Sequence, residues 1–375
     1  MFEFLTKSKT QPIGLDIGHS AIKMIQLSRS DQTICVEAAE KETLDRNLEP
    51  GSQQWFEQLT DLIRTLYHRG GFRGREVVSC LPGDVIRIKS LRLDSNYPEE
   101  IEEVMKTEVA KRFGMDPDSD EIRYMVAGNA YQGDQIKNEV IFFGTEQEQV
   151  NRHIDLIEQA GLTPISLDTV PSALFRCFQS TLRSSGNQDS VSVFVDMGTQ
   201  FTTVIIGRGQ KVAFVKQIPI AGDEFDKQVS KRLGISLKEA AELRDRSRHA
   251  DSEGVDTETK RVVIDAMNNS IESLAHEISL CFRYYAVTFR GERPVKAAFA
   301  GGEAYESALI DALRKYVGVE ICVAEPLGGF DLSHADFDRR SNPQMCEWAI
   351  AAGLALKGLG MTEIRSQKQL EAMTA

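Results

Sequence analysis

Two stretches of the sequence, residues 13–27 and 191–206, place an Asp-x-Gly triplet and a polar turn between two apolar, strand-like runs. A turn of glycine and small polar residues lets successive backbone N–H groups point into one concavity, where they can hold phosphate oxygens. Each stretch therefore predicts a phosphate-binding hairpin. The first carries Asp16, Gly18, His19 and Ser20, and the second carries Asp196, Gly198, Thr199 and Gln200.

The aspartate of each stretch ends its strand and faces the same space as the turn. Magnesium keeps most of its waters and is usually bound by one or two carboxylates together with substrate phosphates, so Asp16 and Asp196 are candidate magnesium residues. The first stretch alone also fits an ordinary hairpin in which Asp and Gly serve the turn. The second copy, close to half a chain length later, indicates an internal duplication and predicts two half-molecules that face one nucleotide.

A third candidate segment, residues 295–303, runs from an apolar strand into Gly301, Gly302 and Glu303, with a helix expected over 304–316. A strand that ends in paired glycines before a helix lets bare backbone lie against a ligand. Because it follows two Asp-x-Gly hairpins, this segment is predicted to meet the adenine and ribose of the nucleotide.

The composition limits the possible functions. The chain has 375 residues, more than one hydrophobic core usually holds, so two or more domains are expected. Its net charge of −12 argues against a nucleic-acid surface, which needs clustered Lys and Arg. No stretch approaches the roughly 20 apolar residues of a membrane span and no secretory signal is recognisable, so we expect a cytoplasmic protein. The six scattered cysteines are typical of reduced thiols, and no structural metal is predicted.

The elements around the first hairpin are typical of an α/β unit. Apolar residues at helical spacing predict a crossover helix over 55–66, and a strand follows over 77–81. From there to about residue 150 the pattern changes to strand, helix and two strands, which predicts a small inserted β-α-β-β subdomain. The main fold then resumes with a helix over 146–160, a strand over 164–168 and a helix that opens at Pro171.

The second half is expected to contain more helix. A polar linker over 184–189 precedes the second hairpin, and a charged loop is predicted over 244–260. The next helix carries an apolar stripe over 263–285, which is far more typical of core packing than of a ligand surface. A polar loop over 331–344 and a helix over 343–359 follow, with a polar tail after them.

The order of two Asp-x-Gly hairpins, then a strand, two glycines and a helix, resembles the actin, Hsp70 and sugar-kinase superfamily. Within it, the chain resembles the PilM family of type IV pilus assembly proteins, which are relatives of the cell-division protein FtsA. The segments that carry the resemblance are residues 13–27, 81–83, 160–168, 195–198, 218–223, 234–243, 301–302 and 351–355. The resemblance implies an α/β fold of duplicated actin-like (ribonuclease H-like) domains, with the small β-α-β-β subdomain inserted where PilM and FtsA carry theirs.

The resemblance also divides the chain and assigns roles to its residues. The first actin-like half would comprise residues 1–82 and 146–188, the inserted subdomain residues 83–145, and the second half a core over 189–220, a nucleotide-side subdomain over 221–294 and a further core with the C-terminal helix over 295–375. Asp16 and Asp196 would hold hydrated Mg²⁺. The phosphates of ATP would be bound by Gly18, His19, Ser20, Lys23, Gly198, Thr199 and Gln200, and the nucleoside by Glu242, Gly301, Gly302 and Glu303.

The function that the resemblance implies is that of a cytoplasmic, ATP-binding scaffold. It would bind the cytoplasmic tail of a bitopic inner-membrane PilN-like protein beside the inserted subdomain, and so lie peripheral to that membrane without inserting into it or binding nucleic acid. Contacts with other pilus-machine components and self-association are also open.

Two alternatives remain open on the same fold. A small-molecule kinase would turn over ATP only with an added acceptor. An FtsA-like filament protein would need a C-terminal amphipathic helix for the membrane, and residues 361–375 contain few large apolar residues.

Hydrolysis is expected to be slow or absent. Relatives in the superfamily place an acidic residue directly before the proline that opens the helix after the fifth strand, where it orients the attacking water. Here Val170 precedes Pro171, and Asp168 lies two residues earlier. Positioning is most of what a protein contributes to phosphoryl transfer, so the sequence predicts that ATP acts as a structural clasp.

Overall fold

The computed structural model describes residues 11–360 except 31–32, 46–47, 49, 95–97, 183–189, 249–254, 336 and 338–343. The strands are β1 (Ile13–Ile17), β2 (Ala21–Ser30), β3 (Thr33–Thr43), β4 (Glu76–Cys80), β5 (Arg87–Leu93), β6 (Glu121–Gln132), β7 (Gln135–Thr145), β8 (Thr163–Asp168), β9 (Val191–Met197), β10 (Thr202–Arg208), β11 (Lys211–Ile218), β12 (Lys296–Ala300) and β13 (Glu320–Val323). The α-helices are α1 (Gln53–Arg69), α2 (Pro98–Phe113), α3 (Gln147–Gln159), α4 (Val170–Leu182), α5 (Gly222–Leu233), α6 (Leu237–Arg248), α7 (Thr257–Phe289), α8 (Ser307–Val317) and α9 (Ala349–Gly358), and two 3-10 helices are η2 (Gly302–Tyr305) and η3 (Cys346–Trp348).

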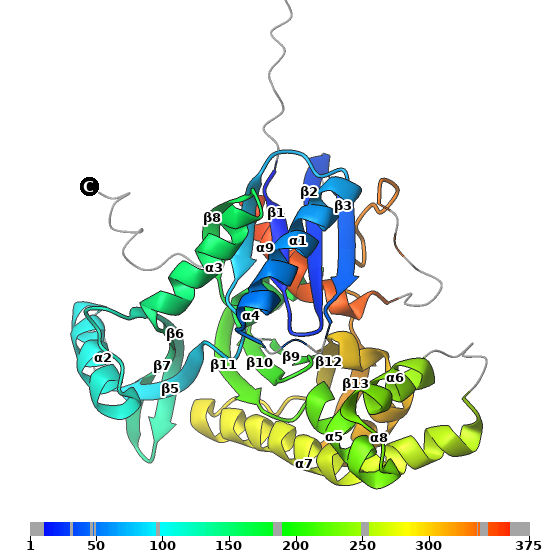
Figure 1. Cartoon of the computed structure of the whole chain (residues 1–375). Coiled ribbons are helices and arrows are strands. Elements are labelled where there is room, and N and C mark those ends of the chain that lie inside the picture. The colour runs from blue at the N-terminus through cyan, green and yellow to red at the C-terminus, as the bar shows by residue number, and fades with distance from the viewer. Residues whose placement is uncertain are drawn as a thin grey trace, which may run out of the picture.

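Two five-stranded sheets repeat the same connectivity. Their orders are β3-β2-β1-β4-β8 and β11-β10-β9-β12-β13. In each sheet, the first three strands along the chain form an antiparallel meander, and the last two strands run parallel to the first strand of that meander. The predicted duplication is therefore confirmed. Figure 1 shows the first sheet, blue except for the green β8, above the second, which runs from green to orange.

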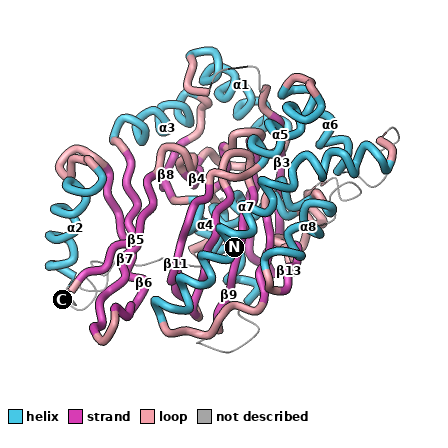
Figure 2. Tube along the Cα trace, turned by 90° about the horizontal axis from the view of Figure 1, so that it is seen from below, coloured by secondary structure: helices cyan, strands magenta, loops and turns pink. Residues whose placement is uncertain are grey.

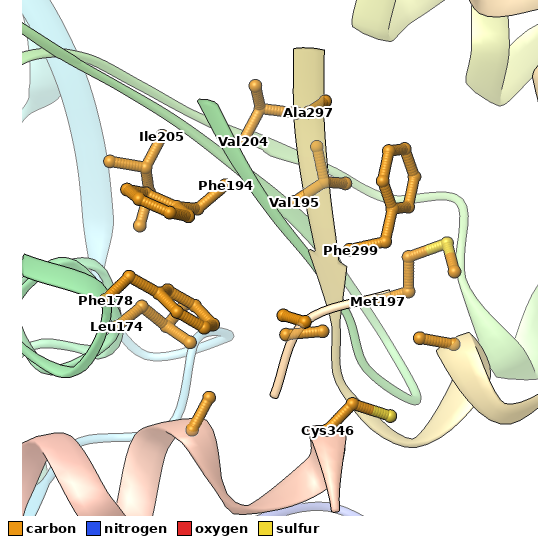
Figure 3. Packing of buried hydrophobic residues seen from close by; sticks show 14 of the residues in the cluster. Leu174, Phe178, Phe194, Val195, Met197, Val204, Ile205, Ala297, Phe299 and Cys346 are labelled. Carbon is orange, nitrogen blue, oxygen red and sulfur yellow. The ribbon is translucent and has the colours of Figure 1, made fainter. Parts of the chain in front are cut away.

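The core of the second sheet explains why its strands read as unbroken apolar runs. Helices cover these strands, so residues on both faces are buried, as in Phe194 and Val195 of β9. Figure 3 shows Leu174 and Phe178 of α4 facing Phe194, whose ring stacks on that of Phe178 with centroids 4.6 Å apart. Full burial of one such side chain stabilises the fold by about 1.5–3 kcal/mol.

Helices α4 and α9 cross at backbone contact. A Cβ at Gly353 of α9 would overlap the carbonyl oxygen of Ala173 in α4, and a Cβ at Gly14 of β1 would overlap the carbonyl oxygen of Ala351 in α9. Only glycine at these two positions allows so close an approach. Helix α9 therefore packs tightly on both α4 and the first sheet.

The inserted β-α-β-β subdomain is confirmed, and it docks on the second half. Strands β5, β7 and β6 form its sheet, and Figure 2 shows this sheet beside β11 and the end of α7. The buried carboxylate of Glu139 on β7 accepts hydrogen bonds from Arg92 Nε at 3.1 Å and from the Tyr284 hydroxyl of α7 at 2.7 Å. Arg92 also donates to Thr288 Oγ1 at 2.9 Å, so the insert is held to α7 by polar contacts as well as by packing.

Three expected boundaries are wrong. The charged loop predicted over 244–260 is helical at both ends, because α6 continues to Arg248 and α7 begins at Thr257. The helix predicted from residue 304 begins only at Ser307, after η2, and the helix predicted over 343–359 is the shorter pair η3 and α9. The predicted linker 184–189, much of the loop 331–344 and the tail 361–375 lie outside the described residues. Among the described helices, none is both long and apolar enough to cross a bilayer.

Candidate functional site

The two Asp-x-Gly hairpins close with the same turn. The N–H of Gly18 donates to the carbonyl of Ala21 at 3.0 Å, and the N–H of Gly198 donates to the carbonyl of Phe201 at 3.0 Å. This turn leaves the N–H groups between the bonded residues available for a ligand. The second hairpin is further supported by the start of α5, where the N–H of Asp223 donates to the carbonyl of Thr199 at 2.8 Å.

The hairpins face each other across one cavity of about 370 Å³. That volume lies in the range of small-molecule sites. Of the thirteen residues predicted for the site, twelve line this cavity and Glu242, which is exposed on α6, does not. The twelve are Asp16, Gly18, His19, Ser20, Lys23, Asp196, Gly198, Thr199, Gln200, Gly301, Gly302 and Glu303.

The two aspartates and Lys23 form a buried charged group at the bottom of the hairpins. Lys23 stands opposite Asp16 in the β1–β2 register, and its Nζ lies 3.1 Å from Asp16 Oδ2. Burial raises the pKa of Asp196 to about 7, the nearby charge of Asp16 adds to this shift, and Lys23 opposes it. Burial alone would lower the pKa of Lys23, but Asp16, Glu347 and Asp196 outweigh it and raise that pKa.

This charge distribution suits a cation with few protein ligands. Two buried carboxylates repel each other, and the single lysine offsets the charge of only one of them. An added cation would therefore stabilise the ionised form of the second carboxylate. The second hairpin has Thr203 opposite Asp196, where the first has Lys23, so the duplication is chemically asymmetric at this point.

His19 does more than contribute a backbone N–H. Its Nε2 lies 3.2 Å from Oδ1 of Asp84, which follows the cavity-lining residues Pro82 and Gly83. Partial burial would raise the pKa of Asp84, but the hydrogen bond and charge of His19, with backbone N–H groups, outweigh it and lower that pKa. The first hairpin is therefore tied to the segment that leads into the inserted subdomain.

The nucleoside end of the cavity differs from the expectation at Glu303. Gly301 has φ +88°, and a Cβ there would overlap the carbonyl of Met197, so bare backbone lines the cavity as predicted. The carboxylate of Glu303, however, is buried between Arg244, at 2.5 Å, and Arg248, at 2.7 Å. Burial alone would raise the pKa of Glu303, but these two guanidinium groups outweigh it and hold it at about 2.

Arg244 is the centre of a buried ionic cluster. Its side chain is 0% exposed and pairs with Asp226 of α5 at 2.7 Å, with Glu303 and with Glu306 at 2.7 Å. Its guanidinium also lies over the ring of Phe225. These contacts fasten α6 to α5 and to η2, so Glu303 supports the wall of the cavity and its carboxylate is engaged by arginine.

The two residues expected to govern hydrolysis lie in different surroundings. Val170 lines the cavity. Asp168 does not line it, because its Oδ2 is held by Arg176 at 2.9 Å and by Lys357 at 3.3 Å. The carboxylate nearest to Val170 in sequence is therefore engaged behind the cavity wall.

The cavity also contains residues that the sequence does not indicate. Asp245 and Arg248 reach it from α6, and Lys41 pairs with Glu347 at 2.6 Å on its wall. Among them, Asp245 could have been found from the sequence, because it follows the predicted Glu242 by three residues and so lies near it on the helix surface.

Comparison with known proteins identifies the family. The sequence model of the family described as type IV pilus assembly protein PilM matches residues 14–359. The structure is similar to a chain of a PilM-PilN type IV pilus biogenesis complex, with a TM-score of 0.75 and 22% identity over 93% of this chain and 98% of that chain. It is also similar to the ethanolamine utilization protein EutJ from Carboxydothermus hydrogenoformans, with a TM-score of 0.54 and 13% identity over 92% of this chain and 89% of that chain. These likenesses confirm the actin-like fold, and because the family match spans nearly all of the described residues, the chain belongs to the PilM family of type IV pilus assembly proteins.

Proposed function

We propose that this chain is an ATP-binding scaffold of type IV pilus assembly that works on the cytoplasmic side of the inner membrane. The observation that carries this proposal is the convergence of two Asp-x-Gly hairpins on one cavity, with Lys23 between their aspartates. The backbone N–H groups of both turns would bind phosphates, and the bare backbone of Gly301 and Gly302 would lie against the nucleoside.

Magnesium would be held by Asp16 and Asp196 through its waters. Within the described part of the chain, no three metal-ligating side chains gather into one group, which is consistent with an ion that takes most of its ligands from water and phosphate. The raised pKa of Asp196 fits this role, since a bound cation favours the deprotonated carboxylate and offsets the repulsion from Asp16.

In this proposal the ribose contact on α6 is assigned to Asp245 instead of Glu242. Glu242 is outside the cavity, whereas Asp245, three residues later on the same helix, lines it. Asp245 would accept hydrogen bonds from the ribose hydroxyls, and Arg248, fixed by Glu303, would present its guanidinium beside them.

Hydrolysis would be slow, so that ATP acts mainly as a clasp between the halves. Val170 cannot orient a water molecule, and Asp168 is paired with Arg176. A ligand that binds the closed form better than the open one stabilises the closed form by its preferential binding. The proposed rate lies far below the roughly 1 s⁻¹ that marks the low end of ordinary enzymes.

The proposed partner is the cytoplasmic tail of a PilN-like bitopic membrane protein. Membership of the PilM family and the likeness to a PilM-PilN complex support this assignment. An added strand or short helix is the usual way in which a small mixed subdomain recognises a peptide, so the tail would bind beside the inserted β5-β7-β6 sheet.

Calorimetric titration with ATP tests the nucleotide site. Asp196→Ala should weaken ATP affinity at saturating Mg²⁺ because one of two carboxylates that orient the ion is lost, while Asp61→Ala, on the exposed face of α1, should leave it unchanged. An Asp196→Ala variant that binds Mg·ATP as tightly as the parent would contradict the site as assigned.

A pull-down from solubilised membranes tests the partner. The full chain, loaded with Mg·ATP, should retain one bitopic protein with a short cytoplasmic tail. Deletion of the insert is a poor control, because Ile86, Ile141 and Phe143 belong to the main core, so the intact protein should be challenged with a synthetic peptide of the retained tail. Failure of that peptide to displace the captured protein would place the contact elsewhere.

A further inference from the structure

The chain passes from the first half into the inserted subdomain beside the nucleotide cavity. Its root, which we define as residues 81–86, directly follows β4, and Leu81, Pro82 and Gly83 line the cavity. Because β4 lies next to β1 as β12 lies next to β9, the root occupies the place in the first half that Gly301 and Gly302 occupy in the second. The duplication thus puts the start of the insert where the other half has a ligand-binding loop.

Leu81 and Ile86, at the two ends of this root, are buried in the main core, and few polar contacts hold the residues between them. His19 Nε2 lies 3.2 Å from Asp84 Oδ1, and the Gln217 amide of β11 donates to the carbonyl of Gly83 at a long 3.4 Å. The N–H of Val85 donates to the carbonyl of Pro82, also at 3.4 Å. The contact with His19 is the shortest of the three, and it comes from the same turn that would bind phosphate.

We propose that His19 transmits the presence of the γ-phosphate to the inserted subdomain by exchanging Asp84 for the phosphate. The imidazole Nε2–H can donate to one acceptor at a time, and a phosphate oxygen offers a charge-assisted hydrogen bond. The phosphate charge also repels the Asp84 carboxylate. ADP, which lacks this phosphate, leaves the contact intact, so the root is loosened by ATP alone.

The rest of the insert decides what this loosening does. Glu139, Arg92 and Tyr284 hold the far side of its sheet to α7, and these contacts lie away from the cavity-lining residues. Loosening residues 82–85 therefore lets the insert shift relative to the first half, while the buried Leu81 and Ile86 and the contacts with the second half still hold it. The space between the insert and the first half, where the tail is proposed to bind, would change with the nucleotide; this inference rests on the proposed function and names its regulation.

Hydrogen exchange measured by mass spectrometry tests this inference in the full-length protein. Amides of residues 83–88 are compared with saturating Mg·ADP and with a saturating Mg-bound, non-hydrolysable ATP analogue. We expect about tenfold faster exchange with the analogue, as the loss of one hydrogen bond to a charged group implies. Asp84→Ala removes the acceptor of this hydrogen bond, so it should bring the two states together by making the root fast in both.

A matched control lies in the same subdomain. Asp94, at the end of β5, pairs with Lys137 at 3.1 Å and does not line the cavity. Asp94→Ala should therefore keep the tenfold difference. Equal exchange of the parent in both nucleotide states, or a difference that survives Asp84→Ala, would overturn the inference.

Nucleotide affinity, titrated separately for each variant, distinguishes this inference from the proposed function. Asp84→Ala should bind the ATP analogue at least as tightly as the parent does, since Asp84 lies outside the cavity lining and the phosphate no longer has to displace its carboxylate from His19. A parent that binds neither nucleotide would overturn the proposed function, and the inference with it. A parent that binds both with identical exchange overturns the inference alone.

Discussion

The Asp196→Asn substitution should stabilise the protein without nucleotide while it weakens the nucleotide site. Asp196 is 7% exposed, and burial together with Asp16 raises its pKa from 3.8 to about 7. A raised folded-state pKa means that the carboxyl contributes fully to stability only below about pH 4, and that this contribution is lost as the pH rises through 7. This pKa shift of about three units limits the loss of folding stability at pH 8 to about 4 kcal/mol, and a neutral amide avoids that loss.

Urea unfolding of the Mg-free and nucleotide-free protein at pH 8 and pH 5 measures this effect. The variant should be more stable than the parent at pH 8, by up to about 4 kcal/mol, and this gap should shrink by more than half at pH 5. At pH 5 the folded parent is already protonated and only its unfolded chain ionises. Asp61→Asn on the surface of α1 is the control and should show no such gap. A gap that is absent at pH 8, or that is the same at both pH values, would refute the argument.

Three further substitutions test other parts of the structure. Val170→Glu should raise the ATP turnover, measured as phosphate release, by at least about tenfold, and a variant no faster than the parent would show that the missing carboxylate is not the cause of slow hydrolysis. Arg244→Met should lower the free energy of unfolding by about 3–5 kcal/mol in urea titrations, because Asp226 loses this partner and Glu303 and Glu306 are left to share Arg248. A loss below about 1 kcal/mol would mean that the cluster relaxes. Gly353→Ala should lower the free energy of unfolding by at least about 1–3 kcal/mol in the same assay, since the added Cβ would overlap the Ala173 carbonyl. Gly360→Ala is the comparison. It should cost less, because open space surrounds Gly360 even though its φ is +68°.

The hairpins and the insert could be predicted because short-range patterns determine them. An apolar run, Asp-x-Gly and another apolar run specify strand, turn and strand within about fifteen residues, and repetition of that pattern reveals the duplication. The twelve cavity residues follow from those turns and from the Gly301-Gly302 pair, in which the close approach of Gly301 to the Met197 backbone excludes a side chain.

The ionic cluster could not be predicted in this way. Arg244 lies in a segment rich in Lys, Arg and Glu that is typical of a solvated surface. Its partners come from other elements, Asp226 from the preceding helix and Glu303 and Glu306 from much later in the chain. Charge alone does not show which residue is buried, because burial depends on partners that tertiary packing brings together. For the same reason Glu303 seemed free to bind a nucleoside, and the pairing of His19 with Asp84 left no trace in either segment.

The contact between α9 and β1 has a consequence for synthesis on the ribosome. Gly14 is among the first described residues and Ala351 among the last, so the helix that covers this face of β1 is made long after the strand. At about 5–20 residues per second, tens of seconds pass between them. During that time the first sheet lacks the helix that completes its core, and its apolar face is open to chaperones. Arrest of translation before residue 349 should therefore leave a chaperone-bound nascent chain, even though all five strands of that sheet have already emerged.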